Sequence, residues 1–134
     1  MKTLLRAAVC LSLASIAYAL GGDTIESVLA DPAKYDKKEL KVVGKVIEFK
    51  QKTSRKGNQY FTIKLGGLIK KDDVINVYSQ GKLEPEPKVG DKLQAWGIFR
   101  QEKKVLDFTV KNEIDATQAE EKGKKKFGVT PVKE

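Results

Sequence analysis

Apolar and polar residues alternate along several short segments of this chain, and this period of two is the feature that most limits its fold. The alternation runs through segments near residues 40–49, 60–65, 75–78, 93–100 and 106–111. A period of two points successive side chains to opposite faces of a strand, so each segment predicts a half-buried β-strand. No segment repeats another. The sequence therefore predicts an all-β domain of five strands.

The first of these segments changes phase partway along. Leu40 and Val42 set one alternation, whereas Ile47 and Phe49 continue it one residue out of step. Such a slip indicates a β-bulge near residues 44–46, so we expect one long strand that bends between two sheets.

The alternation also predicts which side chains form the core. The residues expected to fill the interior are Phe61, Ile63, Leu65, Ile75, Val77, Leu93, Leu106 and Phe108. Gly44 and Gly97 interrupt two strands and are expected where a strand bends or two backbones approach closely.

A short helix is expected before the first strand, and a tail after the last. Asp23 can cap a helix, Glu26 follows three residues later, and Pro32 ends the pattern after about two turns. We expect this helix, within a lead-in over residues 20–38, to plug one end of the sheet. The composition changes after Ala116, where the segment 117–134 is basic and poor in apolar residues, so it predicts a disordered or weakly tethered tail.

Three runs give the chain a resemblance to a known fold family. They are TSRKGNQYFTIKL (residues 53–65), KVGDKLQAWGIFR (88–100) and VKNEIDA (110–116). The runs resemble OB-fold domains of the tRNA-anticodon-binding-like class, which implies a five-stranded OB-fold barrel over residues 39–116 and nucleic-acid binding. The segment 79–88 departs from that family, because it leaves little room for the helix that often joins strands three and four. The chain also resembles bacterial periplasmic OB-fold proteins in its leading segment.

The first nineteen residues have the layout of a secretory signal peptide. Lys2 and Arg6 precede an apolar run over 7–16, and an A-x-A site follows at 17–19. The apolar run is shorter than the roughly 20 residues that span a bilayer. We therefore expect cleavage after residue 19, export to the periplasm or the medium, and no remaining membrane span. Cleavage removes Cys10, the only cysteine of the chain.

Positive charge is concentrated in one part of the sequence. Between Lys45 and Lys71 there are eight basic residues and one acid, whereas the whole chain carries a net charge of +8. OB-folds bind ligands on the face of strands two and three, between the loops that join strands one–two and four–five. The residues expected there are Lys50, Lys52, Arg55, Lys56, Tyr60, Thr62, Lys64, Asn76, Tyr78, Arg100, Lys103 and Lys104.

Basic side chains follow phosphates and tyrosine rings stack on bases, so this set favours single-stranded nucleic acid or a similar polyanion as the ligand. Alternatives stay open. The lysines can be an ordinary solvated surface, and Tyr60 and Tyr78 can be a cross-strand pair. Trp96 can pack under the leading helix or the tail. A second function, a periplasmic protein-binding or envelope adaptor, also stays open, because the export signal argues against a housekeeping nucleic-acid role.

An enzyme is not expected. The chain has no His, and Cys10 is removed, so His-based catalysis and His or Cys metal sites are excluded. Asp72 and Asp73 are adjacent carboxylates in a loop, which more simply form a turn beside Lys70 and Lys71 than a metal site. We expect a monomer with no cofactor and no metal.

Overall fold

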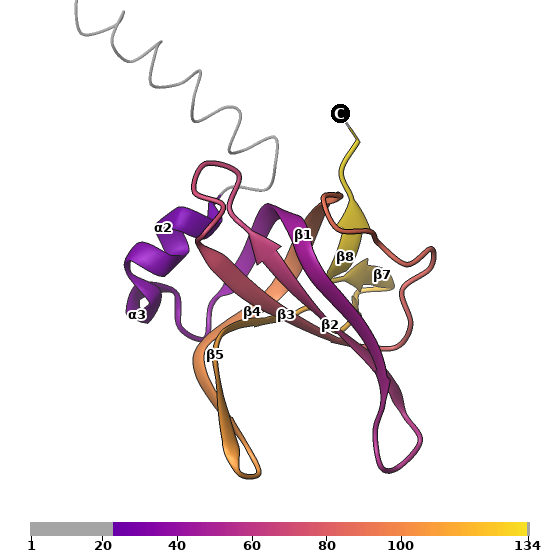
Figure 1. The fold of residues 1–134 in the computed structure, drawn as a ribbon. Helices are drawn as coiled ribbons and strands as arrows, with labels where there is room; N and C mark the ends of the chain where they lie inside the picture. The colour runs from indigo at the N-terminus through magenta and orange to yellow at the C-terminus, as the bar shows by residue number, and fades with distance from the viewer. Residues whose placement is uncertain (1–22, 134) are drawn as a thin grey trace, which may run out of the picture.

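The computed structural model describes residues 23–133, so the predicted signal peptide and Cys10 lie outside the described residues. The structure is predominantly β, as predicted (Figure 1). Its elements are α2 (Ile25–Ala30), α3 (Pro32–Tyr35), β1 (Glu39–Thr53), β2 (Gln59–Gly66), β3 (Val74–Gln80), β4 (Lys92–Val105), β5 (Phe108–Asp115), β6 (Ala119–Glu121), β7 (Lys124–Lys126) and β8 (Gly128–Pro131).

Five strands close into a ring in the order β1, β2, β3, β5, β4 and back to β1. All neighbours in the ring are antiparallel except β3 and β5, which are parallel. The long strand β1 closes the ring because it changes partner: Glu39–Lys45 pairs with β4, and Lys45–Thr53 pairs with β2. Its register shifts between Val46 and Glu48, so the predicted bulge is confirmed, slightly later than expected. The prediction of two sheets is wrong, because the strand bends within one sheet that holds both of its partners.

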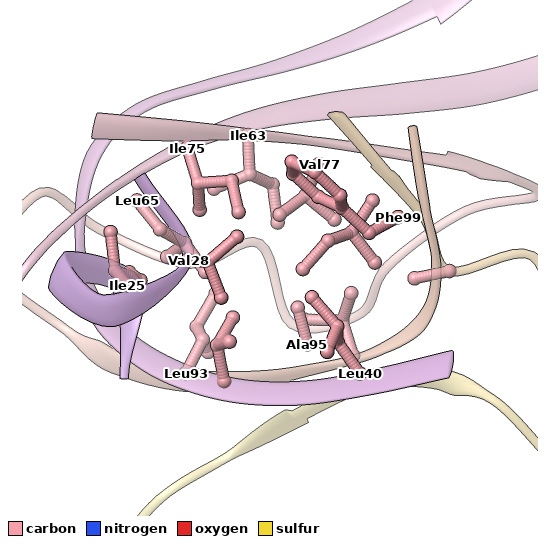
Figure 2. Close-up of a cluster of buried hydrophobic side chains, with 14 of the residues drawn as sticks. Ile25, Val28, Leu40, Ile63, Leu65, Ile75, Val77, Leu93, Ala95 and Phe99 are labelled. Atoms are coloured by element: carbon pink, nitrogen blue, oxygen red, sulfur yellow. The ribbon is translucent and has the colours of Figure 1, made fainter. Parts of the chain in front are cut away.

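The interior of the ring is filled by the inward-facing residues of the five strands (Figure 2). Six of the eight predicted core residues are buried, namely Phe61, Ile63, Leu65, Ile75, Val77 and Leu93. The prediction is wrong for Leu106 and Phe108, which are 88% and 59% exposed. They lie at the tip of the β4–β5 hairpin, which extends beyond the ring, so there is no interior for them to face.

Two glycines permit close backbone contacts, as predicted. A Cβ atom at Gly97 would collide with the carbonyl group of Asp115 on β5. A Cβ atom at Gly44 would lie 2.6 Å from both the carbonyl oxygen of Gly66 and the Cδ1 atom of Ile25. Both positions therefore exclude a side chain because another element occupies the space.

Helix α2 covers one end of the ring, which confirms the predicted plug. Ile25 and Val28 are fully buried and join the core (Figure 2). The helix begins one residue later than expected: Thr24, rather than Asp23, is the N-cap, and it exchanges hydrogen bonds with Ser27 in a capping box. A second short helix, α3, follows within the predicted lead-in and begins at Pro32.

The segment after residue 116 is ordered, so the prediction of a disordered tail is wrong. Strands β6 and β7 form a hairpin in which Glu120 faces Lys125 and Glu121 faces Lys124. The two-residue turn, 122–123, has positive φ at both positions, which matches a tight type I′ turn. Strand β8 then pairs with β4 and buries Val129 in the core. Ion pairs of Lys126 with Glu121 (2.7 Å) and with Glu39 (3.4 Å), together with one apolar anchor, thus order a segment whose composition is typical of disorder.

Candidate binding surface

Strands β1, β2 and β3 place the predicted ligand-binding residues on the outer face of the ring. In one row across the strands, Lys50 faces Thr62 and Thr62 faces Tyr78. In the next row, Lys52 faces Tyr60. Directly opposed residues of paired strands point to the same face, so these five side chains share one surface, which we call the β1–β3 face.

Two tyrosines form the centre of the β1–β3 face. The ring centroids of Tyr60 and Tyr78 lie 5.7 Å apart, and the rings are tilted by 38°. Both side chains are partly exposed. The two rings therefore pack on each other as a cross-strand pair, and part of their aromatic surface is still accessible to a ligand.

Lys103 reaches this face from β4 and is held there by two contacts. Its Nζ atom lies 4.5 Å from the centre of the Tyr78 ring, within cation–π range. The same atom forms an ion pair of 2.6 Å with Glu113 on β5, whose side chain is only 8% exposed. The ammonium of Lys103 is thus engaged by the protein's own groups, which makes it less accessible to an outside anion than an unpaired lysine.

Two further lysines share one carboxylate. Glu48 lies 3.7 Å from the Nζ atom of Lys50 and 3.8 Å from that of Lys64. Both lysine side chains are more than half exposed, so these ion pairs are weak and can be exchanged for a phosphate. Asn76 is less available, because its side-chain amide donates a hydrogen bond of 2.9 Å to the carbonyl oxygen of Lys111.

The β1–β2 hairpin presents exposed cations at its tip. Its loop is closed by hydrogen bonds from the Ser54 amide to the Asn58 carbonyl (2.8 Å) and from the Gly57 amide to the Ser54 carbonyl (2.9 Å). This turn holds the exposed Arg55 and Lys56 in solvent, and among residues 23–133 neither forms an ion pair.

The β1–β2 and β4–β5 hairpins extend from the same side of the ring, and their tips stand apart (Figure 1). The predicted residues consequently form two groups. Lys50, Lys52, Arg55, Lys56, Tyr60, Thr62, Lys64, Asn76 and Tyr78 lie on β1, β2, β3 and their loop, whereas Arg100, Lys103 and Lys104 lie on β4. Of the second group, Lys103 reaches the tyrosines, while Arg100 and Lys104 are exposed along the other hairpin.

Trp96 belongs to a separate cluster that is already occupied by the protein's own groups. Its indole N–H donates to Glu39 (3.1 Å), its ring carries the Lys41 ammonium at 4.3 Å, and Phe127 meets it edge-on at 5.5 Å. The Trp96 donor holds the pKa of the Glu39 carboxyl below its ordinary value despite partial desolvation, with help from Lys126. Packing of Trp96 under the C-terminal segment, rather than under the leading helix, is therefore confirmed.

The acidic partners Glu48 and Glu113 are the site residues that sequence reasoning missed. The alternation of β1 places Glu48 on the same face as Lys50, so its position was available from the sequence. The position of Glu113 beside Lys103 could not be read from the sequence, because the two residues meet only through the pairing of β4 with β5. Within the described part of the chain, no three acidic side chains gather in a way that could hold a metal ion.

The fold and surface together define an all-β protein whose five-strand ring carries a basic, tyrosine-bearing outer face. Comparison with protein-family models, with curated proteins and with solved structures finds no match. Over residues 23–133, no helix combines the length and the apolar character needed to cross a bilayer.

Proposed function

We propose that this protein is an exported, non-catalytic OB-fold module that binds single-stranded nucleic acid, or a similar polyanion, with little sequence preference. Support for the OB-fold assignment comes from the five-strand ring with its bent first strand, since OB-folds are five-stranded Greek-key barrels. In that fold, ligands bind on the face of strands two and three, between the hairpin loops that extend here from one side of the ring.

The Tyr60–Tyr78 pair is the observation that carries the proposal. The two partly exposed rings are in contact and provide a surface on which bases can stack. Lys50 lies in the same cross-strand row as Tyr78, and Lys52 lies in the same row as Tyr60, so cations stand beside this stacking surface. Bases of any sequence have a π-face, so stacking on Tyr60 and Tyr78 tolerates all of them.

The phosphate contacts are assigned to five of the cations that no buried carboxylate holds. These are Lys52, Arg55, Lys56, Lys64 and Arg100. Neutralising about five phosphates of a single strand predicts a slope near −3.5 when the logarithm of affinity is plotted against the logarithm of salt concentration. Lys103 contributes through Tyr78 instead, because its ammonium is paired with Glu113.

The test is a fluorescence anisotropy titration of a single-stranded oligonucleotide at several salt concentrations. The variant Tyr60→Ala/Tyr78→Ala should lose at least about tenfold in affinity, since stacking contributes about 1–3 kcal/mol per base. The matched control Tyr60→Phe/Tyr78→Phe keeps both rings and should retain most of the affinity. A flat salt response, or equal affinities for the alanine and phenylalanine variants, would overturn the proposal.

A second candidate function is an envelope or protein-binding adaptor without nucleic-acid binding. The observation that favours it is the exposure of Leu106 and Phe108 at the tip of the β4–β5 hairpin. In that case, oligonucleotides bind only as weakly as they do to any basic protein, and loss of both tyrosine rings changes nothing.

A further inference from the structure

The tip of the β4–β5 hairpin exposes apolar side chains that neither the core nor the turn requires. Leu106 is 88% exposed and Phe108 is 59% exposed. The paired residues Val105 and Phe108 close the hairpin around the turn at 106–107. A single exposed apolar residue is ordinary, but two large ones at the end of a projecting hairpin form a localised apolar tip.

The backbone conformation at Leu106 is one that disfavours a leucine. Its φ angle is 51°, in the left-handed region where Gly, Asn and Asp are favoured. A leucine at such a position costs turn stability and, being exposed, gains no core packing. Neither turn geometry nor core packing therefore explains the leucine at this position.

Cations surround this tip and the neighbouring one. Lys104 and Lys111 flank the apolar residues, and Asp107 lies in the turn between them. Lys103 is held by Glu113, and Glu102 faces Lys111 across the hairpin. The tip of the β1–β2 hairpin, with Arg55 and Lys56, extends from the same side of the ring (Figure 1).

We propose that the two hairpin tips dock the protein on an anionic lipid bilayer. Leu106 and Phe108 enter the interfacial region, while the cations of both tips contact lipid headgroups. Shallow apolar insertion combined with nearby Lys and Arg is how peripheral proteins bind anionic membranes. A protein partner fits less well, because a stable interface buries about 800 Å² on each side, far more than two side chains on a convex tip provide. This inference does not rest on nucleic-acid binding, because it does not use Tyr60 or Tyr78.

Another exposed apolar residue offers a matched control at the other end of the molecule. Ile69 is 81% exposed in the β2–β3 loop, whose backbone amides are hydrogen-bonded to Glu26 of helix α2, away from the two tips (Figure 1). The charges that follow it cancel, since Lys70 and Lys71 are balanced by Asp72 and Asp73. The proposal therefore predicts that this loop does not meet the membrane.

The first experiment locates the contact with a tryptophan at the tip. It uses the chain that begins at Leu20, because the apolar run of the leader would itself enter lipid. In phosphatidylcholine vesicles containing about one third phosphatidylglycerol, Phe108→Trp should show blue-shifted emission and quenching by brominated lipid. The control Ile69→Trp, corrected like Phe108→Trp for the emission of Trp96, should show neither. Quenching of both variants, or of the control alone, would overturn the proposal.

The second experiment measures vesicle binding by co-sedimentation. Leu106→Asn/Phe108→Thr should lose at least about tenfold in partitioning, whereas Ile69→Thr should match the wild type. Asn suits a positive φ, so the turn and the thermal unfolding temperature should be kept. Membrane docking would be refuted by equal binding to neutral and anionic vesicles, or by undiminished binding of the tip variant. It would also be refuted if the wild type formed a concentration-dependent dimer that the tip variant lost, because the tip would then bind a second copy of the chain. Tyr60→Ala/Tyr78→Ala should still bind vesicles, so failure of either proposal is separate from failure of the other.

Discussion

The ion pair between Lys103 and Glu113 gives a prediction that separates a structural lysine from a ligand-binding one. Replacing Lys103 by Met removes the ammonium and keeps most of the stem that lies beside Tyr78. The carboxylate of Glu113 then has no cation, although its side chain is only 8% exposed. We expect this substitution to destabilise the fold, not merely to weaken binding.

The size of the effect follows from the burial of the two side chains. Removing one partner of a fully buried ion pair costs about 3–5 kcal/mol. The Lys103 side chain is 26% exposed, so water partly screens the pair, and we expect a loss of about 2–3 kcal/mol. For a domain of this length, such a loss lowers the unfolding temperature by about 8–12 °C.

The assay is urea unfolding followed by circular dichroism, on both single variants and on Lys103→Met/Glu113→Gln. In the double variant no charge is left unpaired, so its stability should return to within about 1 kcal/mol of the wild type. The control is Lys104→Met, which removes an exposed lysine at the next position and should change stability by less than about 0.5 kcal/mol.

The opposite outcome would refute this reasoning. If Lys103 were an ordinary phosphate ligand, Lys103→Met would leave the unfolding free energy unchanged and would reduce the salt slope for oligonucleotide binding by about 0.7. A double variant as unstable as the sum of the two single variants would equally show that the pair is not coupled.

Two further predictions concern the two ends of the chain. Burial raises the pKa of the Glu26 carboxyl, but the backbone N–H groups, chiefly that of Lys70 and also that of Ile69, outweigh it and hold the pKa below its ordinary value. The unfolded state therefore binds this proton first on acidification, so stability falls as pH drops below the ordinary carboxyl range. Glu26→Gln should lose less stability than the wild type between pH 7 and about pH 3, and equal losses in urea unfolding would contradict this. Phe127→Ala should uncover the only tryptophan, Trp96, and shift its emission to the red with the five-strand ring intact; unchanged emission would show that Phe127 does not cover it.

The strands could be predicted because their signal is local. A period of two assigns each side chain to a face, and the six core residues predicted within the ring are buried. The same period could not predict the exposure of Leu106 and Phe108. Alternation indicates the face of a strand to which a side chain points, and not how far that strand extends past its neighbours. Hairpin length relative to the ring is a tertiary property.

The C-terminal segment shows a different limit of sequence reasoning. Its lysines and glutamates suggested disorder because composition ignores the order of residues. The order places Glu121 opposite Lys124 around a two-residue turn and leaves Phe127 and Val129 to pack on Trp96 and in the core. Turn chemistry together with cross-strand charge pairing would have been the better guide.

Charge counting along the chain overstated one side of the candidate surface. The excess of basic residues between Lys45 and Lys71 is real, yet Glu48 shares its carboxylate with two lysines. On the other hairpin, Lys103 is held by Glu113, a residue that lies ten positions away and meets it only because β4 and β5 are paired. The number of basic residues in a segment therefore exceeds the number of cations that a ligand can reach without breaking an ion pair.

These differences indicate which part of the surface can supply positive charge to a ligand. The cations at the β1–β2 tip, Arg55 and Lys56, extend into solvent on a turn that its own hydrogen bonds hold in shape, so an anion can reach them without breaking an internal ion pair. On the opposite side, the nearest cation to Tyr78 can bind an anion only by leaving Glu113 unpaired. An extended anionic ligand that lies across the tyrosines should therefore depend most on the β1–β2 hairpin for charge and on the two rings for position. The β4–β5 hairpin, with its apolar tip, is left to make a different kind of contact.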